Sequence, residues 1–300
     1  MNDFSARKVF QTVIPAARFP WSKYRFLLAG LCFTGMCGLA TSQPLPPLQL
    51  VHQVVNNELA ANQNDHSHWM YRDSDTVPGK STVKIVVQTS QGTISKTIEL
   101  NGHPLTPQEQ AQDRAKMESI LNDPSVLAKQ RKTSEHDDQQ GIELTKMVAD
   151  AFLWTEVGES NGEITLHFKP NPAFHPPTYA SRVFASMTGQ MVVDAKQKRL
   201  IDLSGTLVQP VEFGWGLLGR LEKGGTFRVV RSQVAPGEWE ITQTHVHISG
   251  HAFIIKSINE QEDEITSHYK ATPASLTLSQ AAQMLTDGQV AKDLGIAPEK

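Results

Sequence analysis

Hydrophobic and polar residues alternate along most of the second half of the chain, which is the pattern of half-buried β-strands. The alternation predicts eight strands, at residues 152–159, 164–169, 182–194, 199–208, 226–234, 239–249, 252–258 and 264–270. Short connections with turn-forming residues separate most of them. Because a parallel crossover needs about a dozen residues or more, links this short predict antiparallel neighbours.

The first half of the chain predicts a helix and three more strands. Apolar residues at three- and four-residue intervals predict the helix over residues 48–63. A short strand at residues 69–72 and a hairpin of residues 82–88 and 93–100 follow it. About eleven strands are too many for a flat sheet, so we expect a strongly curled one.

A helical insertion is predicted at residues 106–151, where the composition changes to Gln, Glu, Lys, Ala and Asp. Thr106, Pro107 and Glu109 make a good helix start, with a capping residue, a proline at the first helical position and an acid in the first turn. We predict two or three helices here, and a partly disordered charged linker is the alternative. Residues 276–294 predict one or two closing helices or a loose tail.

The N-terminus has the pattern of a secretory signal peptide. Five basic residues precede an apolar run at residues 26–39, and Ala40 and Ser42 are the small residues of a cleavage site. The run is shorter than the roughly 20 apolar residues of a membrane-spanning helix. We therefore predict an exported, periplasmic protein, with a signal peptide at residues 1–42 cleaved after Ser42 and a linker at residues 43–47. An uncleaved N-terminal membrane anchor is the alternative.

Removal of the leader changes the charge and the cysteine content. The leader contains five of the 28 basic residues and one of the 31 acidic residues, so 23 and 30 remain, a formal charge of −7. This charge disfavours nucleic acid and anionic membranes as partners. Both cysteines, Cys32 and Cys37, lie in the leader, so the remaining chain can form no disulfide. A bulky residue precedes each cysteine, which disfavours lipid attachment.

Four stretches are distinctive, together with the order of the predicted elements. They are NGHPLTPQEQ at residues 101–110, HFKPNPAF at 167–174, TGQMVVDAKQKRLIDLSGTL at 188–207 and VEFGWGLLGRLEKGGTF at 211–227. In these features the chain resembles the LolA/LolB-like superfamily of periplasmic lipoprotein carriers, and in particular a group of secreted bacterial proteins assigned to that superfamily. The resemblance covers roughly residues 48–272.

The resemblance implies an α+β, mainly β fold. About eleven antiparallel strands would form a half-open, incomplete β-barrel, with the insertion at residues 106–151 as a lid or plug. Residues 273–300 would be a C-terminal helical or flexible tail. No activity is assigned to the group, so the resemblance informs the fold more than the function.

A carrier of this fold encloses an apolar cavity, whereas an ordinary domain fills the same space with side chains. The residues expected at the cavity or its mouth are Val193, Phe213, Trp215, Leu217, Val246 and Ile248. We therefore predict a noncatalytic protein that binds a lipid, a lipoprotein acyl chain or another apolar ligand in a half-barrel. The alternative is a cell-envelope scaffold or protein-interaction module with a solid core. Membrane contact would occur only through an uncleaved leader or the cavity mouth.

Catalytic motifs give little support for an enzyme. The chain has no H-E-x-x-H motif and no glycine-rich phosphate loop, and without the leader it has no thiol nucleophile. The acidic residues 262–264 are expected in a solvated turn between the last two strands. We predict no enzymatic activity, and a hydrolase is the remote alternative.

Three histidines, His245, His247 and His251, form an H-x-H-x3-H pattern. Alternation along the predicted strand places His245 and His247 together on its polar face, opposite Val246 and Ile248, which mark the buried side. Zinc needs a third and usually a fourth ligand, so these two histidines are weak metal candidates. We predict no metal and no cofactor.

Overall fold

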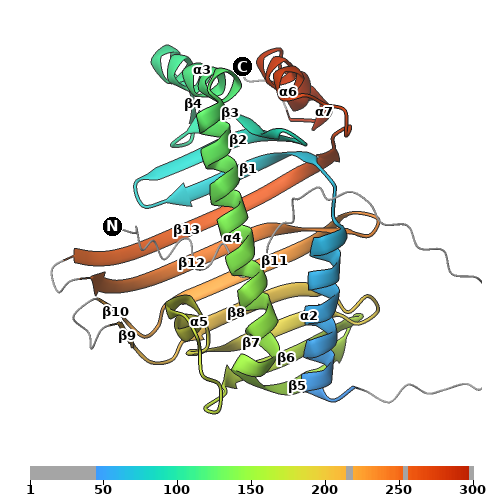
Figure 1. Ribbon diagram of the computed structural model, residues 1–300, viewed down its shortest axis with the longest axis vertical. Coiled ribbons are helices and arrows are strands. Elements are labelled where there is room, and N and C mark those ends of the chain that lie inside the picture. Colours follow the sequence, from blue (N-terminus) through green and yellow to red (C-terminus); the bar gives the residue numbers. More distant parts are fainter. Residues whose placement is uncertain (1–44, 214–218, 253–255, 297–300) are drawn as a thin grey trace, which may run out of the picture.

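One open antiparallel sheet dominates the computed structural model, which describes residues 45–213, 219–252 and 256–296 (Figure 1). The sheet has 13 strands in the order β4-β3-β2-β1-β13-β12-β11-β8-β7-β6-β5, and the short strands β9 and β10 pair beside β12. The sheet is not closed into a barrel, so the predicted α+β, mainly β class with an incomplete barrel is confirmed. The predicted signal peptide, Trp215 and Leu217 lie outside the described residues.

The strands follow the chain with few long connections. They are β1 (Trp69–Val77), β2 (Lys80–Thr89), β3 (Gly92–Leu100), β4 (His103–Pro104), β5 (Phe152–Ser160), β6 (Glu163–Pro170), β7 (Met187–Asp194), β8 (Leu200–Leu207), β9 (Val211–Phe213), β10 (Gly219–Leu221), β11 (Thr226–Ala235), β12 (Glu238–Ala252) and β13 (Lys256–Ala271). Three of these, β4, β9 and β10, are only two or three residues long. These three strands were not predicted, whereas the strands predicted at 252–258 and 264–270 are a single strand, β13, so the total is 13 rather than eleven.

The helices are α2 (Pro47–Asn64), α3 (Pro107–Asn122), α4 (Pro124–Ala151), α5 (Tyr179–Phe184), α6 (Leu278–Thr286) and α7 (Gln289–Asp293). Helices α3 and α4 are the predicted insertion. Thr106 caps α3 in a capping box, because its hydroxyl accepts from the Glu109 amide while the Glu109 carboxylate accepts from the Thr106 amide. Asp123 caps α4 by accepting from the Ser125 amide at 2.8 Å.

Two predicted boundaries were wrong. Residues 252–258 and 264–270 are not two strands, because β13 runs without a turn through the acidic residues 262–264. Both neighbours, β12 and β1, supply backbone partners along this stretch, and that pairing overrides the low strand propensity of Glu and Asp. The strand predicted at 182–194 begins only at Met187, since Thr178 and Ser181 form a capping box that starts α5.

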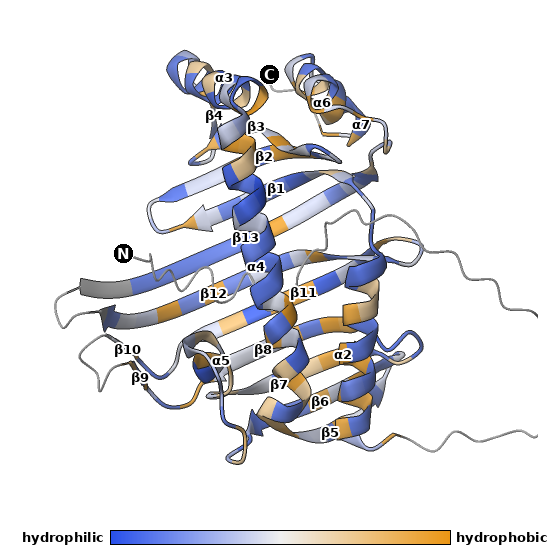
Figure 2. Cartoon of the chain, viewed as in Figure 1, coloured by the Kyte–Doolittle hydropathy of each residue, from blue (hydrophilic) through white to orange (hydrophobic). Residues whose placement is uncertain are grey.

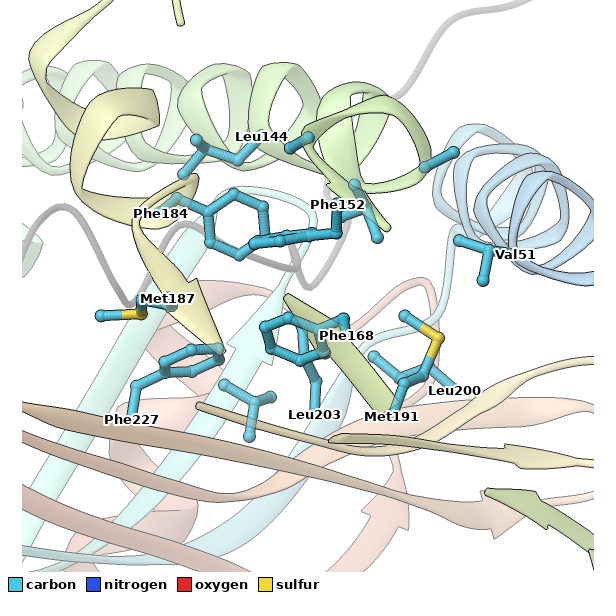
Figure 3. Packing of buried hydrophobic residues seen from close by; sticks show 14 of the residues in the cluster. Val51, Leu144, Phe152, Phe168, Phe184, Met187, Met191, Leu200, Leu203 and Phe227 are labelled. Atoms are coloured by element: carbon cyan, nitrogen blue, oxygen red, sulfur yellow. The ribbon is translucent and has the colours of Figure 1, made fainter. Parts of the chain in front are cut away.

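Helices α2 and α4 cover one face of the sheet, here called the inner face (Figure 1). The larger core lies between these helices and the strands β5–β8, β11 and β12. Figure 3 shows aromatic rings filling this space. The ring centroid of Phe152 lies 4.5 Å from that of Phe168 and 5.0 Å from that of Phe184. These rings come from β5, β6 and α5, and Val51 of α2 and Leu144 of α4 pack in the same cluster.

A pair of glycines on β7 and β8 lets rings pack flat against the inner face. Gly189 and Gly205 lie opposite each other. A Cβ atom on Gly205 would lie 2.6 Å from Cε1 of Phe227 and 3.2 Å from Cζ of Phe168. A Cβ atom on Gly189 would lie 1.9 Å from the carbonyl oxygen of Ser204. Neither position has room for a side chain.

A second core lies at β1–β3. Met70, Ile85 and Val87 pack there with Leu285 of α6 and Val290 of α7. Residues opposite each other across strands share a face, and the register of β1, β2, β12 and β13 puts the strand residues of this core on the face away from α2 and from the middle and end of α4, here called the outer face. The start of α4 reaches this core through Leu127. The described part of the predicted tail, residues 273–296, therefore contains α6 and α7, which pack against the sheet.

Helix α4 crosses the inner face from one end of the sheet to the other (Figure 1). Near its start, Gln130 donates to the carbonyl oxygen of Thr93 on β3 at 3.2 Å. Near its end, it buries Leu144 and Val148 in the larger core. Its middle is hydrophilic (Figure 2). Within the described residues, no helix has the length and apolar character needed to cross a membrane.

Candidate functional site

Four of the residues predicted to contact an apolar ligand belong to the larger core. Val193, Phe213, Val246 and Ile248 are at most 6% exposed and pack in the same cluster. The Phe213 ring meets Tyr179 edge to face, with centroids 5.1 Å apart. These side chains fill space between the sheet and its helices, as a solid core requires.

Helix α2 is held over the inner face by a buried ion network. The Glu58 carboxylate is 5% exposed and accepts from Nε of Arg199 at 2.8 Å, from Nη1 of Arg231 at 2.7 Å and from the Leu200 amide at 2.9 Å. Burial alone would raise the pKa of Glu58, but the charge of Arg231 and the charge and hydrogen bonds of Arg199 lower it below the usual value. Arg231 also donates to the carbonyl oxygen of Trp239 at 2.6 Å. The network fixes the helix and leaves none of these groups at the surface.

A second polar cluster lies on the inner face where β1 and β13 pair. It contains the carboxylates of Asp73, Asp75, Glu262 and Glu264, with Asp75 directly opposite Glu264. Burial and the charges of Asp73, Glu262 and Asp75 raise the pKa of Glu264 to about 7, although Lys84 lowers it. This cluster was not predicted from the sequence, because residues 262–264 were expected in a turn. The sequence could have indicated the cluster, because residues 262 and 264 share one face if they lie in a strand.

An extended polar arrangement lies on the outer face. One side chain from each of six neighbouring strands falls in a single row across the sheet, here called the outer row. From β6 to β13 the outer row consists of His167, Gln190, Ser204, Arg228, His245 and Asp263. Alternation brings these residues to one face, and only the order and register of the strands align them.

A parallel row of Thr188, Thr206, Thr226 and His247 runs beside the outer row. Residues of the two rows line a hollow of about 650 Å³ on β6–β8, β11 and β12. Two basic side chains along this hollow, Arg228 and His245, have acidic partners within the protein. Nε of Arg228 lies 2.6 Å from Oδ2 of Asp202, and Nδ1 of His245 lies 2.5 Å from Oδ1 of Asp263.

Apolar side chains border the outer row on its other side. Val192, Val230 and Ile265 lie one step along the sheet from it, on the same face. Ile265 is 51% exposed, and Val192 and Val230 are half-buried. Asp202 and Gln243 lie between these apolar residues in the same row, so the surface is mixed, with Ile265 as its exposed apolar group. A polar, hydrogen-bonding surface with an exposed apolar residue is compatible with protein binding.

His245 and His247 lie where the sequence predicted, whereas the strand expected to end at residue 249 continues as β12 through Gly250 and His251 to Ala252. His245 and His247 project from the outer face, opposite the buried Val246 and Ile248. His251 lies on β12 with its Nδ1 atom 3.9 Å from Glu222. Across the described ranges of the chain, no group of three His, Cys, Asp or Glu side chains is arranged to hold a metal ion.

The polar residues described on the outer face do not form an activated nucleophile. His245 lies between Asp263 and Thr226, but its Nε2 atom is 3.4 Å from the Thr226 hydroxyl, and the His245 and Asp263 side chains are 41% and 44% exposed. Nucleophile activation needs a closer base and drier surroundings. No G-x-S-x-G nucleophile elbow was expected from the sequence, but the string itself occurs at residues 158–162. This string forms the hairpin turn from β5 to β6, whereas a nucleophile elbow joins a strand to a helix.

Comparisons with known proteins assign no family or function to the chain. No protein-family model matches the chain, and neither does any curated protein or solved structure. The resemblance to lipoprotein carriers therefore stays a prediction.

Proposed function

We propose that the protein is a noncatalytic binding module that docks another protein on the outer face of its sheet, along the outer row. The single observation that carries this proposal is the contrast between the two faces of the sheet. The inner face of β6–β8, β11 and β12 is packed with core side chains, whereas the outer face of these strands and of β13 carries the outer row, its hollow and the exposed Ile265.

The chemistry of the outer face favours a protein as the partner. Arg228 and His245 each have an acidic neighbour, so the face offers donors and acceptors without an excess of positive charge for a nucleic acid. Ile265 and its half-buried neighbours supply the apolar part that interfaces bury at their centre. In the compartment predicted by the leader, such a module would act as an envelope scaffold.

The packed inner face gives little support to the lipid-binding function that the sequence favoured. An acyl chain needs an apolar volume that the protein leaves empty. Val193, Val246 and Ile248, which were expected to line that volume, instead contact other core residues. The protein-binding alternative therefore has the stronger support.

Site-specific photo-crosslinking in cells tests the proposal. A photoreactive residue at Gln190 or Thr206, both exposed on the outer face, should give one discrete adduct with the same protein. The same residue at Lys116 on α3 or Lys132 on α4, which are also exposed, should not give that adduct. Equal crosslinking at all four positions would contradict a dedicated face.

The crosslinked protein, once identified by mass spectrometry and purified, allows affinity to be measured. Ile265→Asp should weaken binding by at least about tenfold, because it places a charge in the apolar part of the interface. Leu48→Asp is the matched control, since Leu48 is a similarly exposed apolar residue on α2. Native mass spectrometry of the purified protein provides the opposing test. One bound amphiphile per chain would favour the carrier function instead.

A further inference from the structure

Arg228 on β11 is held in place by a buried carboxylate on the outer face. Its Nε atom donates to Oδ2 of Asp202 on β8 at 2.6 Å, and the Asp202 side chain is only 8% exposed. Among the described residues, Oδ1 of Asp202 has no hydrogen-bond partner. If Arg228 moved away, it would leave a buried carboxylate without its ion pair, which is strongly unfavourable. Asp202 thus restricts the position of the arginine.

The rest of the Arg228 guanidinium group is available to a ligand. Within the part of the chain that the structure describes, Nε is the one side-chain atom of Arg228 that makes a hydrogen bond or ion pair. The Arg228 side chain is 55% exposed and borders the hollow on β6–β8, β11 and β12. Its two Nη groups form a planar fork that matches the two oxygens of a carboxylate.

Hydrogen-bonding side chains surround Arg228 on the outer face. Ser204 lies directly opposite it on β8, and Gln190 and Thr206 line the same hollow. Cβ atoms of opposed residues lie about 4.5–5.5 Å apart, so an oxygen atom held by Arg228 would be within reach of the Ser204 hydroxyl. The hollow, of about 650 Å³, falls in the size range of ligand sites. It can therefore admit a side chain of a docked protein.

The surrounding charges favour a ligand group with a single negative charge. Arg228 is the one arginine or lysine of the outer row, Asp202 contacts it, and Asp263 lies two strands away in the same row. A phosphate group carries up to two negative charges, and it would meet these two carboxylates with one guanidinium group to balance it. A carboxylate carries one charge and needs only the fork of one arginine.

We propose that Arg228 binds the carboxylate of an aspartate or glutamate side chain in the protein that docks on the outer row. The carboxylate of a chain terminus fits less well, because such groups are captured by free backbone amides. The backbone around Arg228 pairs with β8 on one side and β12 on the other. The inference rests on the proposed docking function and names the chemical group that the outer row recognises on its partner.

Affinity for the purified, crosslinked partner tests the role of Arg228. Arg228→Gln should weaken binding by about ten- to hundredfold, as expected for the loss of hydrogen bonds to a charged group. Arg228→Lys should also weaken binding, because lysine keeps the charge but lacks the fork. Arg114→Gln is the matched control. It removes the same charge from an exposed position on α3, and it should leave the affinity unchanged.

A paired variant separates binding from stability. Arg228→Gln alone leaves the buried Asp202 carboxylate without its ion pair and should lower the unfolding temperature. Arg228→Gln combined with Asp202→Asn removes both charges, so it should recover part of that stability. The paired variant should nevertheless bind the partner as weakly as Arg228→Gln does. Recovery of full affinity together with stability would overturn the inference.

Substitutions in the partner give an independent measurement. Each Asp→Asn or Glu→Gln change in its crosslinked region should be made singly, and one of them should weaken binding as much as Arg228→Gln. Combining that change with Arg228→Gln should cause little further loss, because both remove the same pair. Phosphatase treatment of the partner should leave the affinity unchanged. Loss of binding after this treatment would show that a phosphate group is recognised instead, and would overturn the inference.

The outcomes for Arg228 and for the docking function are distinguishable. A discrete partner that binds Arg228→Gln and Arg114→Gln equally well would overturn the role of Arg228 and leave the docking function standing. The absence of a discrete crosslinked partner would overturn both.

Discussion

Glu58 on helix α2 accepts a hydrogen bond of 2.7 Å from Nη1 of Arg231 on β11, and both side chains are at most 7% exposed. The two residues are 173 positions apart in the sequence. A second arginine, Arg199, holds the other oxygen of the same carboxylate at 2.8 Å. The arrangement places one carboxylate between two guanidinium groups, so the network depends on Glu58 for its charge balance.

Glu58→Gln should destabilise the protein by about 3–5 kcal/mol, because it leaves two buried arginines without their carboxylate. Urea unfolding followed by circular dichroism measures the change. Glu118→Gln on α3 is the matched control, since Glu118 is exposed, and it should change the free energy of unfolding by no more than about 0.5 kcal/mol. Equal stability of the two variants would show that the network is dispensable.

The same carboxylate should give the protein an acid-labile component of stability. The pKa of Glu58 is lowered in the folded state, so its contribution is present above the unfolded pKa of about 4.5 and is lost as the pH falls through the folded pKa. Unfolding measured from pH 6 down to pH 3 should therefore show a steeper loss in the native protein than in Glu58→Gln. Parallel profiles would contradict this assignment.

Glu264 should have the opposite effect on the pH dependence of stability. Its pKa is raised to about 7, so its favourable contribution is present below about pH 4.5 and is lost as the pH rises through 7. Glu264→Gln should therefore stabilise the protein at pH 8 by about 2 kcal/mol, allowing for partial exposure of the group. Thermal unfolding at pH 5 and pH 8 tests this. Glu159→Gln, at an exposed position, should show no such difference between the two pH values.

Gly205→Ala should destabilise the protein by about 1–3 kcal/mol, because the added methyl group would meet the ring of Phe227 at 2.6 Å. A double-mutant cycle with Phe227→Leu isolates the clash. Leucine lacks the ring atom that the methyl group meets, so the double variant should cost less than the sum of the two single variants. Simple additivity would mean that Gly205 is required for another reason.

Local alternation determined which side chains of each strand are buried, and it can be read from the sequence because the period of a strand is two. Val246 and Ile248 were expected inside and His245 and His247 outside, and the structure agrees. The start of α3 at Thr106 was predictable for a similar reason, because a capping box depends on residues three positions apart.

Pairing between distant segments was decided only by the tertiary structure. Residues 262–264 were predicted as a turn from their charges, but hydrogen bonding to β12 and β1 keeps them in a strand. The outer row combines residues from six strands, and a shift of one residue in any register would move a member to the inner face. The Glu58–Arg231 pair likewise exists only once α2 lies on β11. Local periodicity specifies a face for each residue, whereas strand order and register, set by packing of the whole sheet, specify its neighbours.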